Sequence, residues 1–351
     1  MYMQPKHFLA LTLIIILFFL PRPSLAGEEK ARGSDTLTLY LENDLFEDKD
    51  RYYTSGIKIS WISRDLSNYR DVVRAPSWVH RLIEQMPFVN DPGEQRTVSL
   101  SLGQSVYTPE DMERRELIRS DRPYAGVLYL GMGLHSRNNH QMDTFEFGIG
   151  IVGRHSYAED CQEEIHKWTG SDDPKGWAHQ LHDEPLLNVY FERKWRVLQS
   201  RNEGGFGFDF SPHFGIAVGN AYTGMNLGSQ VRFGWNIPND FGTYLIRPGS
   251  DSSAPMDDSD PRFFRPLHRF GIHLFFAADG KFVARNILLD GNTFRDSHSV
   301  DKKPFVMDFI GGIGMIIHRF KITYSYVHRT KEFETQKDEQ HFGAISVSFT
   351  F

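Results

Sequence analysis

A two-residue alternation runs through the C-terminal stretch 341–351, HFGAISVSFTF. Ile345, Val347 and Phe349 point to one face, whereas Ser346 and Ser348 point to the other. Apolar residues facing lipid and small polar residues facing a wet lumen are typical of a transmembrane β-strand. The stretch therefore predicts the closing strand of an outer-membrane β-barrel. The last strand of a soluble sandwich is the alternative.

Similar alternation upstream predicts an all-β chain, a transmembrane antiparallel β-barrel of about twelve strands. The expected strands are 36–43, 53–62, 97–106, 123–135, 141–152, 186–198, 206–218, 222–235, 267–288, 305–317, 319–330 and 341–351. An even number of strands leaves both termini on the periplasmic side. The connections 44–52, 107–122, 153–185, 219–221, 289–304 and 331–340 would then be extracellular.

The N-terminus predicts export to the outer membrane. A cationic start with Lys6, an apolar run at 8–20 and small residues before Gly27 form a secretory signal over residues 1–26. The apolar run is too short to cross a bilayer. The barrel domain is then 27–351, and its terminal Phe351 looks like the signal by which outer-membrane proteins reach the barrel assembly machinery.

Charge and cysteine content exclude two classes of protein. The formal net charge of −6 becomes more negative when Lys6 and Arg22 leave with the signal, which argues against a nucleic-acid binder. The single cysteine, Cys161, gives an exported chain no internal disulfide framework.

Two connections are too long for the periplasmic turns of a barrel. The segment 63–96 contains an expected amphipathic helix, Trp78–Met86, because Trp78, Leu82 and Met86 follow helical spacing. The segment 236–266 is rich in Pro, Asp and Ser and is expected to be irregular.

The first polar cluster at the extracellular ends of the strands contains Asn43, Asp44 and Thr54. If Leu41 and Ile57 face lipid, alternation places Asp44 and Thr54 on the lumen side, where they could share a ligand. Asn and Asp are also ordinary turn residues, so a simple hairpin cap explains the same pattern.

Arginines mark the second cluster, in the loop 107–122. Arg114, Arg115 and Arg119 suit the recognition of phosphate or carboxylate groups. Acidic residues are interleaved with them, so composition alone favours a solvated charged loop.

The third cluster lies in the longest extracellular loop, 153–185. Glu159–Lys167 predicts a short helix on which Gln162 and His166 share a face, and Asp172 follows it. A histidine beside such oxygens could act as a general base near a hard cation. Oxygen ligands from Asp44, Gln162 and Asp172 suit Ca²⁺ better than Zn²⁺. A lone surface histidine usually has no such role.

Together these clusters resemble the outer-membrane lipid A 3′-O-deacylase family over most of the chain. The motifs that carry the resemblance are Asn43-Asp44, Tyr53-Thr54-x-Gly56, Gln104-x-x-Tyr107-x-Pro109, Asp121-Arg122, Gln162-x-x-x-His166, Gly170 and Trp177-x-x-Gln180. The family implies a twelve-stranded barrel that depends on Ca²⁺. It also implies hydrolysis of the ester that holds the 3′ acyloxyacyl group of lipid A, the membrane anchor of lipopolysaccharide.

The resemblance also implies roles for single residues. His166 matches the base that activates water, and Asp44, with Asn43 beside it, matches a residue at the metal site. Thr54 matches another residue of that site, and Gln162 lies with it. Arg114 stands where the family has a lysine, and Asp172 and Pro174 replace a glutamate and a tyrosine.

Two other functions remain open from the sequence. An outer-membrane phospholipase would need a serine nucleophile beside a histidine at the outer rim. Ser55 is the nearest candidate, because His135-Ser136 lies at an expected periplasmic end. A structural barrel or narrow channel would need neither Asp44 nor His166.

Overall fold

The computed structural model describes residues 33–44, 52–73, 75–89, 93–169, 173–202, 204–243, 245–263 and 270–351. The expected signal over 1–26 lies outside these residues. The strands are β1 (Thr36–Asn43), β2 (Tyr52–Ile62), β3 (Gln95–Thr108), β4 (Ala125–Arg137), β5 (Gln141–Val152), β6 (Glu184–Trp195), β7 (Leu198–Ser200), β8 (Phe206–Gly219), β9 (Tyr222–Trp235), β10 (Phe270–Asn286), β11 (Phe305–Ile317), β12 (Phe320–Arg329) and β13 (Gln340–Thr350). The helices are α2 (Ser77–Gln85), α3 (Ala158–Thr169) and α4 (Ile287–Asp290), and four 3₁₀ turns are η3 (Tyr69–Asp71), η4 (Arg154–Ser156), η5 (Trp177–His179) and η6 (Pro261–Phe263).

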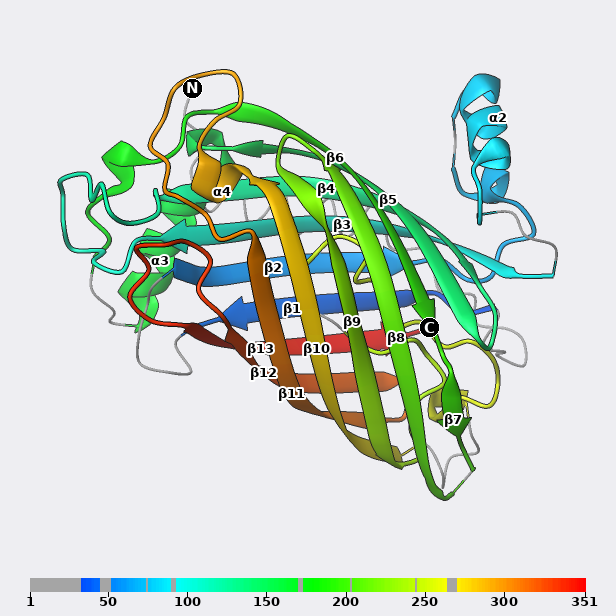
Figure 1. Ribbon diagram of the computed structural model, residues 1–351. Coiled ribbons are helices and arrows are strands. Elements are labelled where there is room, and N and C mark those ends of the chain that lie inside the picture. The colour runs from blue at the N-terminus through cyan, green and yellow to red at the C-terminus, as the bar shows by residue number, and fades with distance from the viewer. Residues whose placement is uncertain are drawn as a thin grey trace.

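Twelve of the strands close an antiparallel barrel (Figure 1). The barrel closes where β13 pairs with β1, with Thr350 opposite Thr36. β6 pairs directly with β8, and the short β7 only extends the edge of β8. The expected strand 267–288 is a single strand, β10, with an irregularity between Val283 and Arg285. The predicted fold class and strand count are therefore confirmed.

The side chains alternate across the wall as the sequence predicts. On β1, Leu39 and Leu41 are exposed on the outside, whereas Thr38 and Tyr40 are buried within the barrel. Ser348 of β13 lies in the lumen, 2.9 Å from the Thr38 hydroxyl. No helix among the described residues is long and apolar enough to cross a membrane.

The two ends of the barrel differ. One, the α3 end, has the connections 44–51, 109–124, 153–183, 220–221, 287–304 and 330–339. The other, the α2 end, has α2, the turns at 138–140 and 318–319 and the start of the segment 236–263 (Figure 1). Phe351 also lies there, where its backbone pairs with Asp35.

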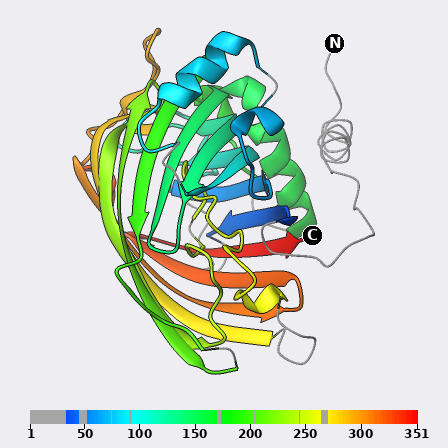
Figure 2. The same ribbon diagram turned by 90° about the vertical axis from the view of Figure 1, so that its right-hand side faces the viewer.

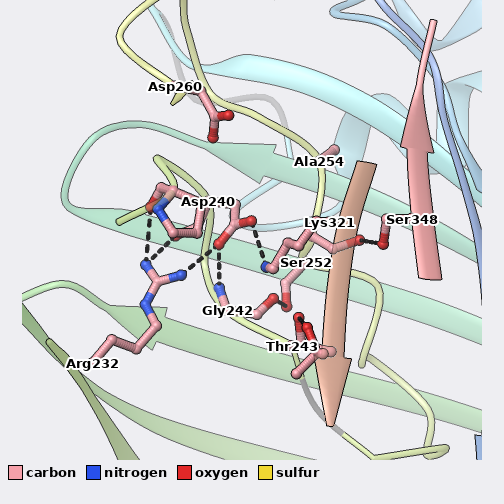
Figure 3. A network of polar contacts seen from close by, with 12 residues as sticks. Arg232, Asp240, Gly242, Thr243, Ser252, Ala254, Asp260, Lys321 and Ser348 are labelled. Atoms are coloured by element: carbon pink, nitrogen blue, oxygen red, sulfur yellow. Dashed lines mark hydrogen bonds and ion pairs between the residues drawn. The ribbon is translucent and has the colours of Figure 1, made fainter. Parts of the chain in front are cut away.

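The segment 236–263, apart from Tyr244, folds back into the lumen and forms a plug (Figure 2). Its Asp240 accepts hydrogen bonds from Lys321 at 2.6 Å and from Arg232 at 2.6 Å, both on the barrel wall (Figure 3). Arg262 of the plug also contacts Asp240, at 3.2 Å, and Asp251 pairs with Lys58 of the wall at 2.9 Å. The sequence correctly predicts an irregular segment, but it does not predict that the segment fills the lumen.

Candidate functional site

α3 lies outside the barrel, against the end of the wall formed by β3 and β4. On β3, Ser105 and Tyr107 line the lumen, so that Gln104 and Val106, which alternate with them, face outward. Val106 packs against Ala158, the first residue of α3. Gly126 of β4 permits this close approach, since a Cβ there would lie 2.1 Å from Ser156 Oγ and 2.2 Å from Ala158 Cβ.

One face of α3 meets the wall. Ala158, Gln162 and His166 follow one another at four-residue spacing, and all three are buried. His166 is 4% exposed, so its imidazole is largely withdrawn from bulk water. The predicted helix 159–167 is confirmed, with Gln162 and His166 on its inner face.

A buried tryptophan holds Gln162 in place. Trp177 Nε1 donates to Gln162 Oε1 at 3.0 Å, and Gln162 Nε2 lies 3.5 Å from Met112 Sδ. The Trp177 ring packs on Tyr124 with centroids 5.0 Å apart, and the Tyr124 hydroxyl donates to the Met112 carbonyl at 2.9 Å. These contacts join α3, the loop that follows it and the loop after β3.

The β1–β2 hairpin supplies the second half of the site. The Asp44 backbone N–H donates to the Thr54 carbonyl at 3.4 Å, and both residues are buried. The Thr54 and Thr108 hydroxyls lie 2.8 Å apart. Thr108 is the last residue of β3, and Met112 follows it in the next loop. The segment 108–112 therefore contacts Thr54 through Thr108 and Gln162 through Met112.

The expectation that Thr54 points into the lumen is wrong. A bulge between Tyr53 and Ser55 breaks the alternation of β2. Tyr53 takes the lumen position, where its hydroxyl donates to Glu42 at 2.7 Å. Thr54 instead meets Thr108, which alternates with the lumen-lining Tyr107. The site therefore lies on the outer side of the wall, beneath α3.

The arginines of the second cluster are exposed on the loop 109–124 at the same end. Arg114, Arg115 and Arg119 all face solvent, and Arg114 Nε lies 3.8 Å from a carboxylate oxygen of Glu116. Asp121 orders this loop by accepting hydrogen bonds from the backbone of Glu110 and Arg122, at 2.8 and 2.7 Å. Burial raises the pKa of the Asp121 carboxyl.

Asn43, Thr54, Arg114 and His166 all lie at the α3 end, as the topology predicts. Asp172 and Gly170 lie outside the described residues. Within the described ranges, no group of three or more His, Cys, Asp or Glu side chains could hold a metal ion. The donors around the site are instead a carboxylate, hydroxyls and an amide oxygen.

Sequence reasoning does not identify Thr108 and Met112, which contact Thr54 and Gln162. Thr108 is a residue between two motif positions, Tyr107 and Pro109, and only the bulge in β2 turns Thr54 toward it. Trp177 and Gln104 belong to the motifs, but the sequence does not indicate their contacts. Gln104 Nε2 donates to the Ser156 carbonyl at 2.6 Å, where the chain enters α3.

A serine–histidine contact is also present, but at the other end of the barrel. His135 Nε2 lies 2.9 Å from Ser99 Oγ, and Nδ1 lies 2.9 Å from Thr144 Oγ1. All three side chains are buried in the wall near the α2 end, so this pair is shielded from substrate.

Comparisons with known proteins agree with this architecture. A family model described as "Outer membrane protein LpxR" matches residues 10–351. The structure of LpxR from Salmonella typhimurium is similar with a TM-score of 0.69 at 17% identity, covering 90% of this chain and 100% of that chain. The β domain of the Bordetella autotransporter BrkA gives a TM-score of 0.43 at 8% identity, covering 91% of this chain and 99% of that one. No curated protein matches the sequence.

Proposed function

Since the chain belongs to the outer membrane protein LpxR family, we propose that it is a lipid A 3′-O-deacylase, an ester hydrolase of the outer membrane. This is the family that the sequence motifs resemble, and the Salmonella structure has the same barrel. The substrate in the proposal is lipid A, the membrane anchor of lipopolysaccharide. The released product is the 3′-linked acyloxyacyl group.

The observation that carries the proposal is the position of the site, between α3 and the outer face of the wall. A lumen site would receive substrates from water, whereas a site on the outer face is open to molecules embedded in the membrane. Short turns and the end of β13 mark the α2 end as periplasmic. The α3 end then faces outward, where lipid A forms the outer leaflet.

In the proposed mechanism, His166 is the general base. Its imidazole removes a proton from a water molecule, whose oxygen forms a bond to the ester carbonyl carbon. The tetrahedral intermediate collapses with cleavage of the bond to the sugar oxygen. That oxygen takes the proton back from His166, leaving a free hydroxyl on the sugar and a free fatty acid. General base catalysis of this kind contributes about 10²–10⁴-fold.

Arg114, Arg115 and Arg119 are the proposed contacts for the sugar phosphates. They are exposed at the rim that carries the site, and guanidinium groups bind phosphates in a bidentate manner. Arg114, at the position of the family's lysine, is also proposed to act on the developing charge of the reacting ester. Preorganised donors toward such an oxyanion are worth about 2.7–4 kcal/mol each.

We also propose a Ca²⁺ site, with Asp44, Thr54, Gln162 and Asp172 as ligands and Asn43 beside them. The donor set fits a hard cation, because it consists of carboxylate, hydroxyl and amide oxygens. Gln162 Oε1 accepts from Trp177 and retains a second lone pair for a metal. The bound ion would supply positive charge close to the ester carbonyl.

Mass spectrometry of lipid A tests the proposed function. Cells that express the protein should contain lipid A lighter by the 3′ acyloxyacyl group, and cells that express His166→Ala should not. Unchanged lipid A, with the folded barrel present in the outer membrane, would contradict the proposal. A phospholipase would instead release fatty acids from phospholipids and react with a covalent serine probe.

A further inference from the structure

The apolar face of α2 is wider than its contact with the barrel. At about 100° per residue, Trp78, Leu82, Val79 and Ile83 form one continuous apolar arc. His80, Arg81, Glu84 and Gln85 form the opposite, polar arc. A helix that only covered the barrel would need apolar residues on the contact side alone.

Half of this arc packs on the outside of the barrel wall. Ile83 is buried, and Val79 is packed against the same cluster, which includes Leu134 of β4 and Phe145 and Phe147 of β5. The Tyr69 hydroxyl in η3 fastens the segment to the wall by donating to the His135 carbonyl at 2.8 Å. α2 is therefore held against the surface of the barrel that faces outward.

The other half of the arc has no such cover. Trp78 is 59% exposed and Leu82 is 55% exposed. Phe88, just beyond the helix, is 42% exposed on one side, while its other side packs on Phe191 and beneath the guanidinium of Arg193, 4.4 Å from the ring centre. Three large apolar side chains are thus grouped on one short segment.

This uncovered surface is continuous with the lipid-facing band of the barrel. Leu130, Ile149, Leu187 and Val189 are exposed on the same strands, β4 to β6, above the cluster that α2 covers. The axis of α2 runs across the direction of the strands (Figure 1). Because the strands of a membrane-spanning barrel are tilted by about 35–45° from the membrane normal, a helix that crosses them on the outside of the wall lies closer to the membrane plane than to the normal.

We propose that α2 and Phe88 form an interfacial anchor in the periplasmic leaflet of the outer membrane. Its ligand is phospholipid, with Trp78, Leu82 and Phe88 inserted among the acyl chains beside the wall and the polar arc turned toward water. An apolar arc with Trp and Leu opposite a charged face is typical of helices that lie in a membrane interface. The anchor requires the membrane location of the barrel but not its enzymatic activity.

Site-specific labels in reconstituted protein test this placement. Cys161→Ser removes the single cysteine, and Leu82→Cys or Arg81→Cys then provides one attachment point for an environment-sensitive fluorophore. The two positions are adjacent in the helix but lie on opposite arcs, so each is the matched control of the other. The full chain is placed in phosphatidylcholine vesicles that contain a lipid with a nitroxide near its headgroup.

The nitroxide lipid should quench the label at residue 82 at least about twofold more than the label at residue 81. Iodide in the water should quench them in the opposite order. Heat-modifiable gel migration verifies that both variants contain a folded barrel.

Three results would overturn the anchor. Equal iodide quenching at the two positions would place α2 in water. Protection of residue 82 from both quenchers would mean that protein, from this chain or a second copy, covers the arc. Equal lipid quenching at both positions would mean that the polar arc is also inserted.

Discussion

His166 combines a basic ring with almost complete withdrawal from bulk water. It lies on the face of α3 that meets the wall, one turn after Gln162, whose position Trp177 fixes. A base held in this way would require no reorientation before it meets a water molecule. Its removal should therefore affect turnover far more than stability.

His166→Ala is expected to lower lipid A deacylation by about 10²–10⁴-fold while the barrel still folds. Activity is measured on purified protein in detergent with lipid A as substrate, and folding by heat-modifiable migration. His155→Ala and His179→Ala are the controls, because both histidines are exposed in the same loop and His155 pairs with Asp183 at 2.6 Å. Near-normal turnover of His166→Ala, or equal damage by a control, would exclude His166 as the base.

Removal of Ca²⁺ is expected to abolish activity and its return to restore it. The proposed ligands Asp44, Thr54, Gln162 and Asp172 are all oxygen donors, which prefer Ca²⁺ to softer metals. The measurement is lipid A hydrolysis after chelation and dialysis, followed by titration with Ca²⁺ or Mg²⁺. Full activity in protein shown to be free of metal would refute the site.

At the scale of elements, the position of α3 depends on the glycine beneath it. Gly126 is the point where β4 passes under Ser156 and Ala158, and any side chain there meets both within 2.2 Å. Because Gly126 has no side chain, the start of α3 can pack directly on the wall, and this contact positions the helix that carries His166 and Gln162.

Gly126→Ala should displace the start of α3 and reduce deacylation, since a shift of about 1 Å at a reacting group can cost about 100-fold. Gly148→Ala is the matched control. Gly148 lies on β5, the strand next to β4, and a Cβ there would meet nothing closer than 3.9 Å. Activity is compared with heat-modifiable migration for both variants. Equal activity of the two would show that α3 does not depend on this contact.

For the whole molecule, the plug converts a hollow barrel into a filled one. Asp240 pairs with Arg232 and Lys321 from two strands of the wall (Figure 3). Arg262 of the plug itself also contacts Asp240, at 3.2 Å. All four side chains are buried, and Arg232 and Arg262 are also paired with Asp209 and Asp260, whereas Lys321 pairs with Asp240 at 2.6 Å. A plug fixed by such contacts argues against an open channel.

Asp240→Asn should destabilise the barrel by about 3–5 kcal/mol, because the buried Lys321 ammonium loses the carboxylate with which it pairs at 2.6 Å. The measurement is the midpoint of urea unfolding, followed by tryptophan fluorescence. Asp258→Asn, at an exposed position of the same segment, should leave the midpoint unchanged. A similar midpoint for both variants would mean that the network around Asp240 does not stabilise the plug.

The sequence by itself determined the barrel, its strands and the end that carries the candidate site. These features follow from a period of two, which each strand displays without its neighbours, as in Ile345, Val347 and Phe349. The helices around Gln162 and Leu82 could be predicted in the same local way, from spacing of three and four residues. The order of short motifs further indicated the family, which the match over residues 10–351 confirms.

Only the tertiary structure decided which side of the wall holds the site and what fills the lumen. Alternation predicts the face of a residue as long as the register is unbroken, and the bulge at Thr54 breaks it through pairing with β3. The plug has no periodic pattern from which its place could be predicted. Its Asp240 and Asp251 are held by Lys321 and Lys58, which lie on strands distant in the sequence. The structure also decides which apolar residues of α2 stay uncovered, because it shows which side of the helix packs on the wall.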